Sequence, residues 1–265
     1  MTQRTVKRFR DDDAVATGVA RSLVHTISEL QRNGGTVTDD GMVRLVLTGG
    51  SVGIGTLRQL LMLDHAAKAS AEDFPVAAID WDRVIIFFGD ERFVAADDAE
   101  RNEVQARQAL LDHVDMPRSN IISYAAPAAD EAFDGDALDR AAVSYAHMIE
   151  REAPDGFDIH LLGMGPEGHV NSLFPHTPEL LDPQSAVAAV RECPKPPANR
   201  VTLALPAVNS SQRVWLVIAG AEKKEAAEHA LAADSSGQWP AGMVSGTAET
   251  CLLYTSDAAD DCCRV

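Results

Sequence analysis

The chain of 265 residues is 46% hydrophobic and 5% aromatic, so it can build an aliphatic core in one large α/β domain or two smaller ones. Its formal net charge of −17 disfavours nucleic acids and anionic membrane surfaces as partners, and a small anionic ligand would need a local cluster of basic residues. The basic start lacks the apolar segment of a secretory signal, and no apolar run is long enough to span a membrane, so we expect a cytoplasmic protein.

The first predicted elements are a helix and a strand. Apolar residues recur every three or four positions from residue 13 to residue 30, which predicts a helix that ends at Gly34-Gly35. Residues 42–47 predict a strand that runs directly into Gly49-Gly50-Ser51, and helical spacing resumes at Leu57. Such a strand-to-helix turn can bind a phosphate through bare backbone N–H groups. A glycine turn needed only for tight packing would look the same.

A second strand is predicted at residues 84–88, and Asp90, Glu91 and Arg92 follow it closely. Charged residues after a buried strand are unfavourable unless they are solvated, paired or bound to a ligand. The alternative to a ligand is a solvated loop in which Arg92 pairs with Asp90 or Glu91. A helix is expected to begin near Asn102.

Further along, residues 121–123 predict a short strand and residues 133–149 a strongly periodic helix. The apolar residues 157–162 then predict a buried strand that ends in a glycine-rich turn, Gly163 to His169. Histidine is the side chain best suited to act as a base near neutral pH. The simpler interpretation is a glycine turn that happens to hold one histidine.

The remaining strands are predicted at residues 186–190, 201–205 and 214–219, and a helix that carries Lys223 follows Gly220. Strands and helices alternate along most of the chain, without an internal repeat or a low-complexity linker. This pattern predicts one α/β domain with a three-layer α/β/α, doubly wound, mostly parallel sheet of Rossmann-like type.

Residues 251–265 differ from the rest of the chain. Three of the four cysteines lie there, and residues 251–261 resemble the translated read-through of a transposase adapter used in preparing DNA sequencing libraries. We therefore expect a single domain over residues 1–250 followed by a non-native tail. A native terminus rich in Ala and Asp is the alternative.

The turns after four predicted strands have complementary contents. In a doubly wound sheet the carboxyl ends of parallel strands face one crevice, so backbone donors, cations and one imidazole would meet there. Basic residues gathered at one edge of an acidic protein favour an anionic ligand such as a phosphate ester. No Gly-x-Ser-x-Gly elbow is present, the histidine spacing favours no metal site, and His160 is expected to point into the core.

Several motifs in order over residues 13–250 make the chain resemble the 6-phosphogluconolactonase family, of the glucosamine-6-phosphate isomerase/6-phosphogluconolactonase superfamily. The matching elements are Gly49-Gly50-Ser51, Phe88 to Val94, Arg101-Asn102-Glu103, Leu162 to His169, Ser172 to Pro175, Pro197 to Thr202, and Gly220 to Lys223.

The resemblance implies hydrolysis of 6-phospho-D-glucono-1,5-lactone to 6-phosphogluconate in the oxidative pentose phosphate pathway, without an organic cofactor. It implies a phosphorylated sugar lactone as the small-molecule partner, and we expect a monomer or weak homo-oligomer. Glu167 stands where an aspartate is commoner, and it is given no defined role beyond helping to orient or charge-match His169. The resemblance assigns catalysis to His169 and Arg92, and substrate or phosphate binding to Gly49, Gly50, Ser51, Asp90, Arg200 and Lys223.

Two alternatives stay open. A deaminase of the glucosamine-6-phosphate type would share the fold, but that group has tyrosine after Asp-Glu and Ala-Phe-Asn after Gly-His-Ile, where this chain has Arg92 and Asn171-Ser172-Leu173. A non-catalytic sugar-phosphate sensor is the second alternative. The joint presence of His169, Arg92 and Lys223 argues against it.

Overall fold

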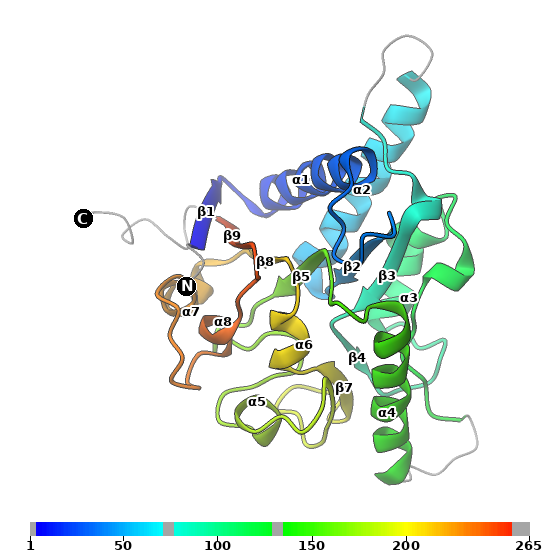
Figure 1. The fold of residues 1–265 in the computed structure, drawn as a ribbon. Coiled ribbons are helices and arrows are strands. Elements are labelled where there is room, and N and C mark those ends of the chain that lie inside the picture. The colour runs from blue at the N-terminus through cyan, green and yellow to red at the C-terminus, as the bar shows by residue number, and fades with distance from the viewer. Residues whose placement is uncertain (1–3, 71–76, 129–134, 256–265) are drawn as a thin grey trace.

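The computed structural model describes residues 4–70, 77–128 and 135–255. A six-stranded sheet forms the middle layer, in the order β1-β9-β8-β5-β2-β3, with every neighbouring pair parallel (Figure 1). The expected mostly parallel, doubly wound sheet is confirmed. Its strands are β1 (Arg4–Phe9), β2 (Val43–Leu47), β3 (Val84–Phe88), β5 (Ile159–Gly163), β8 (Arg213–Ile218) and β9 (Glu249–Thr255).

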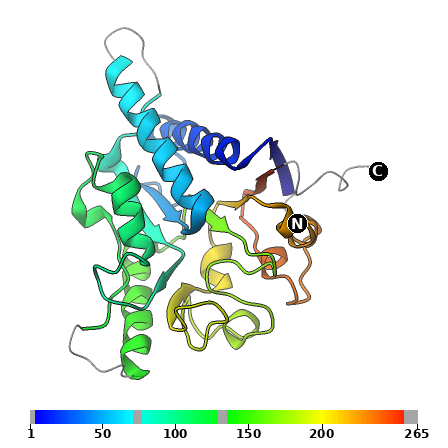
Figure 2. The same ribbon diagram turned by 180° about the vertical axis from the view of Figure 1, so that it is seen from behind.

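Helices cover the two faces of this sheet. Figures 1 and 2 show α1 and α2 packed side by side on one face, with α4 and α6 on the other. The longer helices are α1 (Asp12–Asn33), α2 (Gly50–Ser70), α4 (Gly135–Glu152) and α7 (Lys224–Leu231). The short helices are α3 (Asn102–Ala106), α5 (Pro178–Leu181), α6 (Leu205–Asn209) and α8 (Pro240–Met243). Helix α3 continues as a π-helical turn (Arg107–Leu111). The 3-10 turns are η1 (Trp81–Arg83), η3 (Arg118–Asn120) and η4 (Ala221–Lys223).

Helix α1 illustrates how local sequence sets the boundaries of an element. Asp11 caps its first turn by accepting a hydrogen bond of 2.8 Å from the Ala14 N–H, and two acidic residues in that turn complement the helix dipole. Gly34, with φ of 76°, ends the helix. The predicted apolar stripe is confirmed, because its side chains are all buried: Val15, Val19, Leu23, Ile27 and Leu30.

A second, smaller sheet lies beside the first. Strands β4 (Asp90–Arg92), β7 (Arg200–Leu203) and β6 (Val187–Val190) form it in that order, and both pairs are antiparallel. Strands are predicted at residues 186–190 and 201–205, and the structure has them at 187–190 and 200–203, but they do not belong to the parallel sheet. The charged residues of β4 were expected to form a loop; they instead form the first strand of this smaller sheet.

Two other differences from the expected elements concern short strands. Residues 121–123 make only one isolated bridge, between Ile86 and Ile121, so the predicted strand there is wrong. Strand β1 was not predicted, because its largely polar sequence gives no apolar run and its pairing with β9 joins segments far apart in sequence.

The boundary expected at residue 250 falls inside β9. This strand lies between β1 and β8 and pairs in parallel with both; Leu252 is opposite Val6 on one side and Leu216 on the other. Leu252 and Leu253 are buried, as is Tyr254. Residues 251–255 therefore form part of the sheet, and residues 256–265 lie outside the described residues. The adapter origin expected for residues 251–265 stays a prediction.

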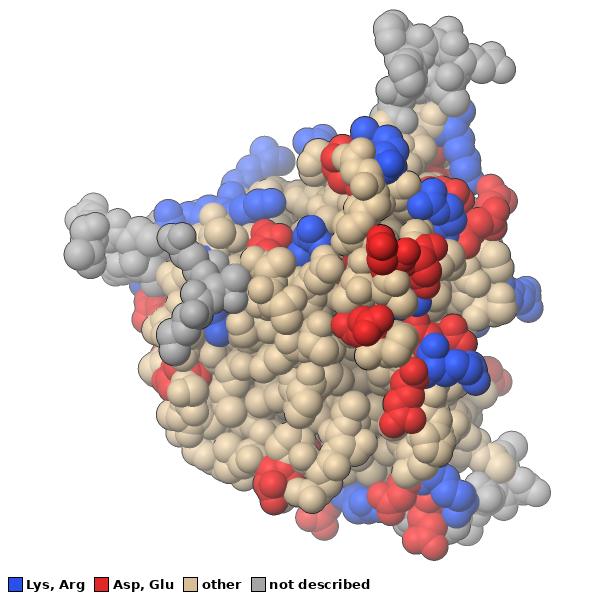
Figure 3. Space-filling model, in the orientation of Figure 1, with Lys and Arg blue, Asp and Glu red and all other residues tan. Residues whose placement is uncertain are grey.

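The charged side chains are unevenly distributed on the face drawn in Figure 3. Acidic and basic residues are interspersed near its margins, and a broad central area is uncharged. In the described part of the chain, none of the helices is both long and apolar enough for a membrane span.

Shortening the Leu252 side chain should destabilise the fold. Leu252 is fully buried in the middle of β9, so Leu252→Ala removes packed methyl groups and leaves a cavity, at a cost of about 2–5 kcal/mol in the free energy of unfolding. Urea unfolding followed by circular dichroism measures the change. Met62→Ala is the matched control, since Met62 is 64% exposed on α2 and its loss should change stability by no more than about 0.5 kcal/mol.

Candidate functional site

A cavity of about 160 Å³ lies at the carboxyl edge of the parallel strands. Its walls come from the loop after β2, the end of β5 and the turn after it, the segment after β8, and strands β4 and β7 of the small sheet. The structure brings all eight residues predicted from the sequence to this one cavity, although their roles stay predictions: Gly49, Gly50, Ser51, Asp90, Arg92, His169, Arg200 and Lys223.

The turn between β2 and α2 places a helix N-terminus at the cavity. Gly50 has φ of 80°, a conformation that glycine adopts without strain, and α2 begins there. The first N–H groups of a helix have no acceptor within the helix, so they are available to an anion. Thr48 holds the turn against β5, because its Oγ1 accepts a hydrogen bond of 3.0 Å from the Gly163 N–H.

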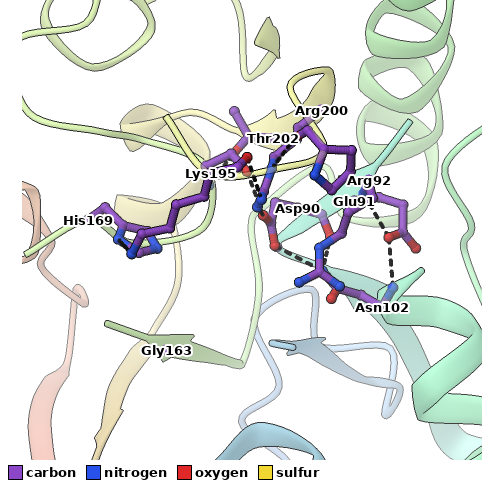
Figure 4. A network of polar contacts seen from close by, with 12 residues as sticks. Asp90, Glu91, Arg92, Asn102, Gly163, His169, Lys195, Arg200 and Thr202 are labelled. Atoms are coloured by element: carbon purple, nitrogen blue, oxygen red, sulfur yellow. Dashed lines mark hydrogen bonds and ion pairs between the residues drawn. The ribbon is translucent and has the colours of Figure 1, made fainter. Parts of the chain in front are cut away.

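Asp90 is buried beside the cavity and is held by several donors. Its Oδ2 accepts a hydrogen bond of 2.6 Å from Ser172 Oγ, and its Oδ1 accepts one of 3.0 Å from Asn102 Nδ2 (Figure 4). Arg200 Nη1 lies 3.7 Å from Oδ2. Asp90 therefore joins β4 to the turn after β5 and to β7.

Glu91 caps helix α3. Its two carboxylate oxygens accept hydrogen bonds of 2.7 Å from the Asn102 N–H and 3.0 Å from the Glu103 N–H, and Arg101 Nε lies 3.6 Å away. Burial raises the pKa of Glu91, and these donors oppose that rise. The side chains of Glu91 and Asp90 are thus occupied inside the protein, so the alternative of a solvated loop is wrong.

Arg92 is not paired with either acid through its guanidinium. Its Nη1 donates to the carbonyl oxygen of Glu100, and its buried Nε has no hydrogen-bond partner among the described residues. Arg92 lines the cavity. It therefore contributes a cation whose hydrogen-bonding capacity is only partly used.

His169 lies in the turn after β5 with its ring stacked on Phe174, at 4.4 Å between centroids and 14° between planes. Its Nδ1 is 3.1 Å from Glu167 Oε1 and 3.5 Å from Lys195 Nζ. Lys195 Nζ is in turn 2.8 Å from Glu167 Oε1. One side of the imidazole thus faces an ion pair, as Figure 4 shows in part.

The surroundings of His169 favour its neutral form. Burial lowers the pKa of His169, and the positive charge of Lys195 lowers it further, while Glu167 and Asp90 act in the opposite direction; the net shift is downward. Burial acts to raise the pKa of Glu167, but the hydrogen bond from Lys195, a backbone hydrogen bond and the charges of His169 and Lys195 together lower it, so that carboxyl stays ionised. A neutral imidazole beside a carboxylate is suited to accept a proton.

Two cationic residues at the cavity differ in what holds them. Arg200 is buried and donates to three backbone carbonyls of the segment before β7, those of residues 195, 196 and 197, at 3.0 to 3.2 Å. Lys223 lies partly buried at the end of η4, where burial lowers its pKa. Lys223 is therefore better placed than Arg200 to bind a ligand by charge.

Sequence reasoning missed three residues of this region. Lys195 lies 26 residues from His169 in sequence, so no local spacing connects them, and only the matched Pro197–Thr202 segment next to it gave a signal. Asn102 and Asn171 line the cavity and are buried, with amide atoms that lack hydrogen-bond partners among the described residues. Asn102 belongs to the matching motif Arg101-Asn102-Glu103, but the resemblance assigns it no role.

Among the described residues, no cluster of three or more His, Cys, Asp or Glu side chains is placed to hold a metal ion. His160 is fully buried in β5, 3.3 Å from Ser211 Oγ through its Nδ1, and burial lowers its pKa to about 3. The expectation that His160 packs into the core is confirmed.

The fold and the cavity define an α/β protein in which a neutral histidine, an arginine and a lysine line one cavity. A family model described as glucosamine-6-phosphate isomerases/6-phosphogluconolactonase matches residues 10–253. The 6-phosphogluconolactonase of Mycobacterium tuberculosis is 41% identical over 260 residues, which cover 96% of this chain and 97% of that protein. The chain therefore belongs to the glucosamine-6-phosphate isomerase/6-phosphogluconolactonase family.

Solved structures show the same fold. The 6-phosphogluconolactonase of Thermotoga maritima is similar with a TM-score of 0.75 and 24% identity, over 96% of this chain and 100% of that one. A monomeric glucosamine-6-phosphate deaminase is similar with a TM-score of 0.75 and 22% identity, over 97% of this chain and 99% of that one. Because lactonases and a deaminase share this fold equally well, these two likenesses establish the fold alone.

Removing the Glu91 side chain should destabilise the structure around the cavity. Glu91→Ala leaves two backbone N–H groups of α3 without their acceptor and removes a buried charge next to Arg101, which should lower the free energy of unfolding by about 3–5 kcal/mol. Urea denaturation measures the loss. Glu100→Ala, at an exposed position on the same segment, should stay within about 0.5 kcal/mol of the unmodified protein. Equal stability of the two variants would contradict the capping role of Glu91.

Proposed function

We propose that this protein hydrolyses 6-phospho-D-glucono-1,5-lactone to 6-phosphogluconate, the lactone-opening step of the oxidative pentose phosphate pathway. The observation that carries the proposal is the neutral His169, backed by Glu167, in a cavity that also presents Arg92 and Lys223. The 41% identity to a 6-phosphogluconolactonase over nearly the whole chain supports it.

In the proposed reaction His169 acts first as a base and then as an acid. Its unprotonated ring nitrogen takes a proton from water as the water oxygen bonds to the lactone carbonyl carbon. The tetrahedral intermediate then collapses, the bond from that carbon to the ring oxygen breaks, and the imidazolium gives its proton to the departing ring oxygen. The product is the open-chain acid, and the histidine returns to its neutral form.

The carbonyl oxygen gathers negative charge in the intermediate, so fixed donors near it lower the barrier. Arg92 and the backbone N–H groups of Gly50 and Ser51 are the groups at the cavity that we assign to anionic oxygens. Lys223 is assigned to the phosphate, because its ammonium is the cation on the wall formed after β8. Asp90 and Arg200 act mainly by holding the walls in place.

The residues around the histidine favour a lactonase over a deaminase. This chain has Arg92 after Asp90-Glu91, and Asn171-Ser172-Leu173 after its Gly-His-Val, in place of the tyrosine and the Ala-Phe-Asn expected of a deaminase. Ser172 is engaged with Asp90, so this difference lies inside the site. If the protein released ammonia from glucosamine 6-phosphate and did not hydrolyse the lactone, it would be a deaminase.

We further propose that the protein acts in the cytoplasm, as a monomer or weak homo-oligomer, without an organic cofactor and without nucleic acid. The net charge of −17 supports the last point, because it repels a phosphate backbone. Size-exclusion chromatography with light scattering tests the oligomeric state.

Replacing His169 should remove most of the activity. His169→Ala eliminates the proposed base, so kcat for acid release from freshly generated 6-phosphogluconolactone should fall by about 10²- to 10⁴-fold. The circular dichroism spectrum should be unchanged. His113→Ala is the control, because His113 is exposed and outside the cavity lining. Turnover like that of the unmodified protein in His169→Ala would refute the assignment of the base.

Replacing Lys223 should mainly weaken substrate binding. Lys223→Ala removes one charged hydrogen-bond donor from the cavity, so KM should rise by about 10- to 100-fold with a smaller change in kcat. Lys224→Ala, one residue further along and not part of the cavity lining, is the matched control. An unchanged KM in Lys223→Ala would rule out its role in phosphate binding.

A further inference from the structure

Lys195 lies next to the His169 ring, in the segment between β6 and β7. Its Nζ is 2.8 Å from Glu167 Oε1 and 3.2 Å from Oε2, and 3.5 Å from His169 Nδ1. His169 is one of the described residues that line the cavity, and Lys195 is not. Lys195 therefore contacts the histidine and its carboxylate but is not among the residues that line the cavity.

The two contacts of His169 Nδ1, with Glu167 and with Lys195, indicate which ring nitrogen carries the proton. An ammonium group donates hydrogen bonds and accepts none, and that of Lys195 is closest to the two oxygens of Glu167. The shorter contact of His169 Nδ1 is the one to Glu167 Oε1, at 3.1 Å, against 3.5 Å to Lys195 Nζ. On the shorter distance we assign the hydrogen on Nδ1 to the contact with Glu167, which leaves Nε2 as the nitrogen that accepts a proton.

A carboxylate next to a histidine has two opposing effects. Glu167 orients the ring, but its negative charge, together with that of Asp90, favours the protonated imidazolium, which cannot act as a base. Lys195 offsets this charge, because it forms an ion pair with Glu167 and also repels a proton from His169. Glu167 can then hold the ring while the ring stays neutral.

The backbone of Lys195 is fixed by Arg200. The buried guanidinium donates 3.1 Å and 3.0 Å hydrogen bonds to the carbonyls of Lys195 and Pro196, and a 3.2 Å bond to that of Pro197. Arg200 Nη1 is also 3.7 Å from Asp90 Oδ2. The ammonium of Lys195 thus extends from a short segment that is itself tied to the buried network of the small sheet.

We propose that Lys195 is a positioning residue for lactone hydrolysis: it clamps Glu167 against Nδ1 of His169, so that the neutral ring presents Nε2 to the reacting water. This inference rests on the proposed function. Arg200 therefore acts on the reaction indirectly, because it holds the segment that carries Lys195. Arg200 also lines the cavity.

The test compares Lys195→Met, which keeps much of the side-chain length without the charge, with Lys195→Arg, which keeps the charge. NMR titration of the His169 ring in the ligand-free protein measures its pKa directly, and this measurement needs no substrate. Loss of the cation should raise the pKa of His169 in Lys195→Met, and Lys195→Arg should restore most of the original value.

The kinetic signature should separate positioning from binding. In Lys195→Met the acidic limb of the kcat profile should move to higher pH, and kcat at neutral pH should fall by about 10- to 100-fold, as is typical when a group that orients a reacting side chain is lost. KM should change by less than about threefold. A large rise in KM with an unmoved pH profile would overturn the proposal and make Lys195 a substrate ligand.

A remote lysine provides the control. Lys68 forms ion pairs with Asp64 and Asp115 near the end of α2, roughly 27 Å along that helix from the cavity. Lys68→Met should leave the His169 titration and the kcat profile unchanged. If the unmodified protein does not hydrolyse the lactone but Lys195→Met shifts the titration, the proposed function fails and the clamp stands. If hydrolysis occurs and the titration does not move, the clamp is refuted.

Discussion

The buried carboxylates of Asp90 and Glu91 hold together the segments that meet at the cavity. Glu91 accepts from the first N–H groups of α3, and Asp90 accepts from Ser172 and Asn102 and lies near Arg200. Two acids in the interior are unfavourable unless each oxygen has donors. Here the donors come from separate parts of the chain, so the acids are satisfied only when those parts are in their native places.

The histidine depends on this arrangement through Arg200. From Asp90 the contacts pass to the Arg200 guanidinium, then to the carbonyl of Lys195, and from the Lys195 ammonium to Glu167 and His169. The neutral state of His169 is therefore a property of the packed protein and not of the glycine-rich turn alone. A turn with the same sequence in isolation would leave the ring exposed and close to its ordinary pKa.

Much of the fold could be predicted because its signals are local. The stripe of α1 and the apolar strands β2 and β3 follow from the spacing and composition of neighbouring residues. Seven of the eight cavity residues could be placed together because parallel strands end at one edge of the sheet, and Arg200 was assigned by the family resemblance alone. Three features could not be predicted, because each depends on contacts between residues far apart in sequence. They are the second sheet formed by β6 and β7, the formation of β1 beside β9, and the position of Lys195 next to His169.

Gly89 is the single residue between β3 and β4. The chain therefore passes from the large sheet to the small one at this one residue. Its N–H donates to Leu47 of the large sheet and its carbonyl accepts from Leu203 of the small one. A Cβ atom at this position would lie 2.3 Å from the Asn171 amide oxygen, so any larger residue would force the Asn171 side chain to move. Since the cavity has one wall on each sheet, a ligand that touches both walls braces the two layers against each other. Ligand binding should therefore raise the free energy of unfolding and the melting temperature of the whole protein. At high ligand concentration the gain in free energy grows with the logarithm of that concentration.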